Sequence, residues 1–135
     1  MKIKTHKGKL VHQAHFFLLN KGMNCGKPLF QPCANCFVLL ADSEKEKEFY
    51  YWLCFALWQT KKFEHYLVGS VIPFIHIADL KNVIAEVKGK ADKKPAQYQK
   101  SLALLIDIDR KSRILAEQLQ LIAQVKKAMF RSLFK

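Results

Sequence analysis

Apolar residues recur every three or four positions in the last third of the chain, residues 95–135. No proline or glycine follows Pro95, so this pattern predicts one long helix with a coiled-coil type of heptad seam. A helix of roughly forty residues extends over about 60 Å, which is more than a domain of this size covers. We therefore expect the seam to pair with a second helix. The predicted interface residues are Leu105, Ile108, Leu115, Leu119, Ile122 and Met129, with Ser112 and Lys126 as polar interruptions that fix the register.

Shorter apolar runs upstream predict a mixed domain. The apolar cluster at residues 16–19 indicates a first strand, and the continuous apolar run at residues 36–41 is typical of a buried one. Between them, residues 20–35 hold two glycines, two prolines and three asparagines. This composition predicts a long surface loop, the kind of segment that often carries function.

A helix is expected to begin after residue 42. Ser43 with Glu46 three residues later forms a capping box, and the early glutamates suit the positive end of the helix dipole. Residues 49–58 are apolar nearly all round, so this is predicted to be the core helix. The pattern extends it until Lys61, Lys62 and His65 lie in its last turns, where positive charge is favoured.

The other segments upstream of residue 95 are expected to be short or irregular. Residues 69–77 are predicted to form a turn and an edge strand that Pro73 interrupts, and Asp79 can cap a short helical turn. Residues 88–94 are charged and predict a linker, and residues 1–9 read as a basic lead-in. The sequence therefore predicts an α+β domain over residues 1–94, followed by a long helix over residues 95–135.

The charge balance points to a polyanionic partner. The chain has 23 Lys and Arg against 11 Asp and Glu, which gives a net charge of +12. From Lys88 onward twelve basic residues face four acidic ones, so the long helix holds much of the excess. No apolar run is long enough to span a bilayer, and no signal peptide is visible, so a cytoplasmic location without membrane contact is expected.

The four cysteines are interpreted as reduced thiols, because a chain with this many apolar residues needs no disulfide scaffold. A zinc site is the alternative. Cys33 and Cys36 have the spacing of a zinc knuckle, and Cys25, His12 and His15 lie nearby in sequence. A second CxxC pair is missing, so no metal or cofactor is assigned, and whether Cys25, Cys33 and Cys36 bind zinc stays open.

An enzyme is not expected. Asp79 followed by Glu86 and Lys88 offers the residue types that hold magnesium in many nucleases, but only six residues separate Asp79 from Glu86. The sequence has no Ser-His-Asp set and no glycine-rich nucleotide fingerprint. No catalytic residue is therefore predicted.

Double-stranded DNA fits the loop residues better. Lysines beside glycines can contact phosphates, whereas Asn can read an adenine edge through two hydrogen bonds. The predicted DNA contacts are Lys21, Asn24, Lys27, Lys61, Lys62, Ser70 and His76.

A family resemblance supports this expectation. The run from Gly69 through Pro73 to Ile75, then Leu80 and Val83, resembles the end of a target-recognition domain in the specificity subunit of type I restriction-modification systems. The steps PAQYQ and IDIDRK, followed by LAEQLQLIAQVKKAMFRSLF, are similar to the spacer helix of that family. The GMNCGK loop and the EKEFYYWLCFALWQTKKF helix also resemble that domain, so the resemblance covers residues 12–135.

The resemblance implies a half-size, non-catalytic specificity component that reads DNA. A full specificity subunit has two recognition domains whose spacer helices pack antiparallel, so one half implies a homodimer paired through residues 95–135. A methyltransferase or restriction subunit is the implied further partner. Ile72 and Phe74 are apolar where the family is usually polar, which favours an alternative: a module that binds such a protein through the long helix without reading DNA.

Overall fold

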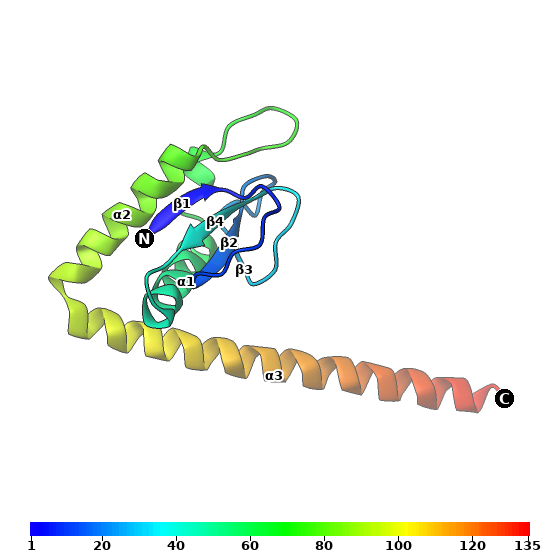
Figure 1. Ribbon diagram of the computed structural model, residues 1–135. Coiled ribbons are helices and arrows are strands. Elements are labelled where there is room, and N and C mark those ends of the chain that lie inside the picture. Colours follow the sequence, from blue (N-terminus) through cyan, green and yellow to red (C-terminus); the bar gives the residue numbers. More distant parts are fainter. The chain divides into compact units, whose positions relative to one another are not determined.

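The computed structural model describes all residues, 1–135, and has the α+β class with a long C-terminal helix that the sequence predicts (Figure 1). The chain divides into two compact units, Met1–Pro95 and Ala96–Lys135. Unit 1 consists of a four-stranded sheet with two helices. Unit 2 consists of helix α3 (Pro95–Leu133) without its first residue, together with the last two residues of the chain.

The sheet is antiparallel throughout, with strand order β1-β4-β2-β3. Strands β2 (His15–Leu19) and β4 (Cys36–Leu40) occupy its centre, where the sequence predicts strands. The edges are β1 (Lys2–Thr5) and the two-residue β3 (Pro28–Leu29). Interpreting residues 1–9 as only a lead-in is therefore wrong, since β1 pairs with β4 and buries Ile3.

Each face of the sheet buries a different set of side chains. Phe16 lies on the face that α1 (Glu44–Gln59) covers, and its ring meets that of Tyr51 edge-on at 5.5 Å. The opposite face buries a small cluster of Phe17, Cys36, Val38 and Leu40. Val11, from the segment between β1 and β2 (residues 6–14, the β1–β2 segment), packs against this cluster.

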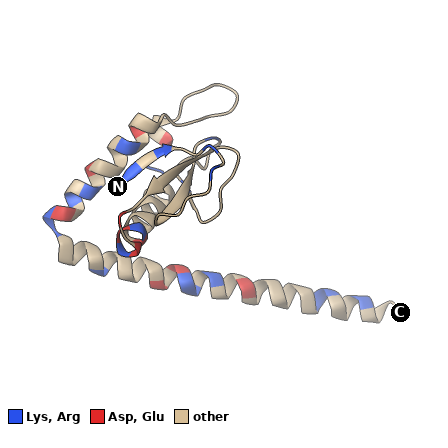
Figure 2. Ribbon diagram, in the orientation of Figure 1, with Lys and Arg blue, Asp and Glu red and all other residues tan.

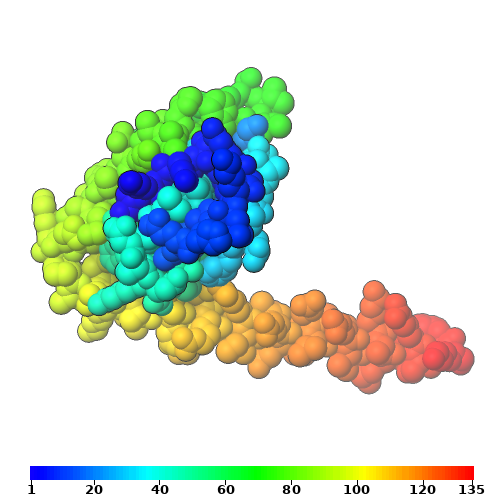
Figure 3. All heavy atoms as spheres, in the orientation of Figure 1, coloured from blue at the N-terminus to red at the C-terminus, as the bar shows by residue number.

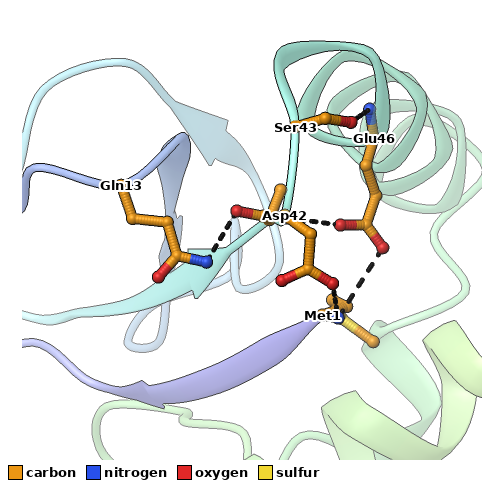
Figure 4. Close-up of polar contacts among 6 residues, drawn as sticks. Met1, Gln13, Asp42, Ser43 and Glu46 are labelled. Carbon is orange, nitrogen blue, oxygen red and sulfur yellow. Dashed lines mark hydrogen bonds and ion pairs between the residues drawn. The ribbon is translucent and has the colours of Figure 1, made fainter.

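The N-terminus of α1 confirms the predicted capping box (Figure 4). Ser43 Oγ accepts from the backbone N–H of Glu46 at 3.1 Å, and Glu46 Oε2 accepts from the N–H of Asp42 at 2.5 Å. The carboxylates of Asp42 and Glu46 also lie 3.8 and 3.6 Å from the amino group of Met1. These contacts join the first strand to the start of the core helix.

Helix α1 ends earlier than predicted. The N–H of Lys61 donates to Trp58 O and that of Lys62 to Leu57 O, both at 3.0 Å, which is the Schellman pattern of a helix end. Lys61 occupies the left-handed region with φ +59°. Lys61, Lys62 and His65 therefore lie beyond the helix, and His65 belongs to the short 3-10 helix η1 (Glu64–Tyr66).

Residues 69–77 form a bend instead of a regular edge strand, and Phe74 makes two isolated bridges, one with Val68 and one with Lys21. The expected short turn at Asp79 is helix α2 (Ile77–Lys93), so the predicted linker over residues 88–94 is wrong. Its charged residues pair along the helix, Glu86 with Lys90 and Lys88 with Asp92, while Ala91 is buried. Pro95 ends α2, because the residue before a proline avoids helical angles.

Candidate nucleic-acid interface

The sheet and its loops carry only positively charged side chains and no acidic ones. Residues 1–41 contain all four strands, six lysines and three histidines, but neither Asp nor Glu. All eight acidic residues of unit 1 come later, starting at Asp42. In Figure 2 the strands carry blue but no red, whereas α1 and α2 carry both. The positive potential of unit 1 therefore arises mainly from residues 1–41, which we call the sheet segment.

The loop after β2 holds its lysines in a fixed shape. Gly22 and Gly26 both have positive φ, +88° and +84°, which glycine adopts without strain. The N–H of Gly26 donates to Leu19 O at 2.7 Å, and that of Lys27 donates to Asn24 O at 3.0 Å. Gly26 also lies against Phe63, because a Cβ at this position would be 2.1 Å from its ring.

Trp58 brings three of the predicted DNA contacts together. Its Nε1 donates to Asn24 Oδ1 at 3.3 Å, and Lys27 Nζ lies 5.1 Å from its ring centroid, a cation–π contact. Asn24, Trp58 and Lys61 line one recess of about 140 Å³, together with Glu64, whose carboxylate lies 3.8 Å from Lys61 Nζ. The bond from Trp58 uses the amide oxygen of Asn24, so this contact leaves its two N–H donors free.

A second group forms around Phe74. Lys21 makes an isolated backbone bridge with Phe74, whose ring meets that of His76 edge-on at 5.2 Å. The N–H of Gly22 donates to Pro73 O at 2.7 Å, which ties the two segments together. The same loop therefore connects the Trp58 group with Lys21 and His76.

Two predicted contacts do not join these groups. Lys62 lies toward α2, where it helps to lower the pKa of Glu86, although the hydrogen bond from Lys90 is the main cause. Ser70 lies on an exposed bend between Gly69 and Val71. Neither residue has a described contact with the Trp58 group.

The cysteines are not arranged as a metal site. The structure has no group of three His, Cys, Asp or Glu residues that could hold a metal ion. Burial raises the pKa of Cys25 to about 11, and burial also raises the pKa of Cys36 and Cys54. These three thiols therefore stay protonated at neutral pH, which disfavours nucleophilic chemistry.

The residues of the nuclease alternative do not converge either. Asp79 lies in the first turn of α2 and Glu86 lies two turns further along the same helix. Glu86 accepts from Lys90 Nζ at 2.6 Å, which lowers the pKa of its carboxyl. Asp79 therefore belongs to the start of a helix, and Glu86 belongs to a surface ion pair.

Five of the six predicted seam residues are exposed apolar side chains. Ile108, Leu115, Leu119, Ile122 and Met129 are 57 to 68% exposed, and Leu105 continues their row toward the start of α3. Asp107 pairs with Lys111 at 2.9 Å, which lowers the pKa of Asp107, and Asp109 pairs with Arg113 at 2.8 Å. No acidic residue follows Glu117, so the C-terminal half of α3 is basic.

Two features were missed at the level of sequence. Trp58 contacts Asn24 across 34 residues of chain and also holds Lys27 over its ring, and local patterns do not report contacts at such a distance. A second apolar row on α3, formed by Ile114, Leu121 and Val125, lies beside the seam and is also exposed. Its seven-four spacing was visible in the sequence and is the signal that could have revealed it.

No helix has the length and apolarity needed to cross a membrane. Neither the curated proteins nor the solved structures include a match to this chain. One family model matches, and it covers residues 3–132. The chain therefore belongs to DUF6943, a family of unknown function.

Proposed function

We propose that the protein binds double-stranded DNA as a helix-paired homodimer, a half-size specificity-type component of a restriction-modification or mobile-element system. The observation that carries the proposal is the sheet segment, whose 41 residues hold six lysines and no carboxylate. Phosphates provide most of the attraction between proteins and DNA, and residues 1–41 contribute no acidic side chain that would repel them.

The loop after β2 supplies the contacts. Lys21, Lys27 and Lys61 are placed around Phe74 and Trp58, where they can neutralise phosphates. Asn24 is exposed and keeps its amide donors free of Trp58, so it is the best candidate for reading a base edge. The proposal that the protein recognises a specific DNA sequence also draws on the resemblance to specificity subunits.

Helix α3 supplies the dimer. Lys126 lies on the seam, so a parallel pair would place the two Lys126 side chains against each other. In an antiparallel pair each seam row faces the other row, and Lys126 faces apolar residues that its methylene chain can cover. Antiparallel packing also separates the two basic C-terminal halves, which lack acidic residues after Glu117.

A second function is favoured by a separate observation. Val71 and Ile72 are 90% and 62% exposed beside Ser70, where a DNA contact was predicted. With the second apolar row on α3, they favour a module that binds a methyltransferase or specificity subunit without reading DNA.

Selection from random duplex oligonucleotides tests the proposal. We expect an enriched motif, and affinity that falls steeply with salt because phosphate contacts release counterions. Replacing Lys21, Lys27 and Lys61 together with Ala should weaken binding at least about tenfold. The matched control replaces Lys81, Lys93 and Lys94, three exposed lysines of α2 and its end, with the same loss of charge. Salt-sensitive binding without enrichment, or equal losses in both triple variants, would contradict sequence reading at this loop.

The dimer is tested by light scattering on the same samples. Leu119→Asp should convert a dimer to a monomer, because it places a carboxylate in the seam. Gln120→Asp adds the same charge on another face of α3 and should leave the mass unchanged. A monomeric parent protein, or equal effects of the two variants, would contradict pairing through this seam.

A further inference from the structure

The β1–β2 segment crosses the sheet face opposite α1 and is fixed at both ends. At its start the N–H of His6 donates to Cys36 O at 3.1 Å, which continues the pairing of β1 with β4. At its end the N–H of Ala41 donates to Ala14 O at 2.8 Å, and Gln13 Nε2 donates to Ala41 O at 2.7 Å. In Figure 3 these N-terminal residues, in dark blue, lie at the molecular surface. Hydrogen bonds to β4 and to the residue after it therefore hold both ends of the β1–β2 segment in place against the sheet.

Between this segment and the sheet lies a groove of about 660 Å³. Its apolar lining consists of the exposed Leu10, the half-buried Val11, and the buried Val38 and Leu40 of β4, against which Val11 packs. Its polar part is formed by Lys4, Lys7, Lys9, Thr5, His6, His12 and Gln13. This volume lies within the range of small-molecule sites, which combine apolar walls with a few polar groups.

The groove has a strongly positive rim. No acidic residue lines it, and the 41 residues from which it is built contain none. Lys4, Lys7 and Lys9 form no ion pair, unlike Lys88 and Lys90 of α2, which pair with carboxylates along the helix. Three ammonium groups that lack a counter-charge favour an anion at this rim.

We infer that the groove binds a nucleoside monophosphate. The phosphate lies at the three lysines, since ammonium groups are good phosphate partners. The flat base packs on Leu10 and Val11, the apolar lining residues that remain accessible, and it gains from leaving water as any apolar surface does. The side chains of Thr5 and His12 offer hydrogen-bond partners to ribose hydroxyls or base edges. Inorganic phosphate would leave the apolar wall unused, and a nucleoside would leave the lysines unused.

This inference does not rest on the proposed DNA binding. The groove uses Lys4, Lys7 and Lys9, whereas the DNA proposal uses the loop lysines Lys21, Lys27 and Lys61. The 5′-phosphorylated end of a single DNA strand presents the same chemistry as a free nucleotide. The two sources are separated by comparing free AMP with oligonucleotides that carry a 5′-phosphate or a 5′-hydroxyl.

Calorimetric titration of the full chain with AMP, adenosine, ribose 5-phosphate and inorganic phosphate is the test. We expect AMP to bind at least tenfold more tightly than each of the other three. Lys7→Ala with Lys9→Ala should weaken AMP binding at least fivefold and leave the weak binding of adenosine unchanged. The matched control, Lys93→Ala with Lys94→Ala, removes the same charge from the end of α2 and should leave AMP binding intact.

The outcomes separate this site from the DNA interface. The inference is overturned if AMP does not bind, if inorganic phosphate binds as tightly, or if the control weakens AMP binding equally. Loss of duplex binding in the Lys21, Lys27 and Lys61 variant with AMP affinity unchanged supports two distinct sites. A preference for the 5′-phosphorylated strand over AMP identifies a strand end as the source of the nucleotide and supports the same groove chemistry.

Discussion

Two leucines in two helices show how differently the units of this protein are stabilised. Leu53 of α1 is 0% exposed among the residues between the helix and the sheet, whereas Leu119 of α3 is 68% exposed. Both residues belong to helices that the sequence predicts. The comparison teaches that apolar spacing specifies a helix and its apolar face, but the structure around that face decides whether it is buried.

Gly26→Ala should produce the largest effect, because it breaks the close packing of unit 1. Its Cβ would lie 2.1 Å from the ring of Phe63, which is buried, and φ is +84°. We expect a loss of roughly 4 kcal/mol in the free energy of unfolding, from overpacking and left-handed strain together. Urea denaturation followed by tryptophan fluorescence measures this loss.

Gly22→Ala is the control for that variant. Its φ is +88°, but no atom lies within 4 Å of the new Cβ. We expect the strain alone, about 1 kcal/mol. Equal losses for Gly22→Ala and Gly26→Ala would show that Phe63 does not pack on the loop as described.

The two leucines themselves sharpen the comparison. Leu53→Ala should lower the free energy of unfolding by about 3 kcal/mol through cavity formation. Leu119→Ala should change it by less than about 0.5 kcal/mol at concentrations where the protein is monomeric. Thermal melts over a range of protein concentrations measure both values. A concentration-independent loss from Leu119→Ala as large as that from Leu53→Ala would mean that α3 is buried within its own chain.

A third variant concerns the polar positions of the seam. Replacing Ser112 and Lys126 with Leu should strengthen pairing of α3 by about 1 kcal/mol and make it less selective, because polar seam residues fix register at some cost in stability. Cross-linking between cysteines introduced at Gln120 and Gln124 would then report mixed registers. Loss of the dimer in this variant would show that the seam is wrongly assigned.

A gain of stability is expected at the end of α1. Lys61→Gly relieves a left-handed backbone, so we expect about 1 kcal/mol more stability, although its ion pair with Glu64 at 3.8 Å is lost. Lys61→Ala removes the same ion pair without relieving the strain and is the matched control. A melting temperature that rises equally in both variants would contradict strain at this position.

Much of the fold was predictable because its signals are local. Ser43 and Glu46 mark the start of α1 three residues apart, and the apolar run of β4 needs no knowledge of its neighbours. The end of α1 was not predictable, because Lys61 adopts the backbone angles that normally mark a glycine. Strand β1 has only one buried residue, Ile3, so its sequence alternates too briefly to indicate a strand.

The candidate site depended on contacts distant in sequence, whereas the end of α2 depended on pairs within the helix itself. Residues 88–94 were interpreted as a linker because they are charged, yet Lys88 bonds to Asp92 one turn away, which raises the pKa of Lys88. Asn24 and Lys27 were predicted as contacts from residue type alone. Their placement by Trp58 depends on the packing of α1 beside the loop, which no spacing within the loop encodes.

The two edges of the sheet limit how copies of this protein can aggregate. Exposed backbone on an edge strand invites a second copy to add its own strand, the route by which many sheets form fibres. Here β1 is four residues long and carries Lys2 and Lys4, while β3 is two residues long and begins with Pro28, which has no N–H to donate. Both edges therefore resist strand addition, so the sheet can be concentrated at a shared surface without polymerising through its strands.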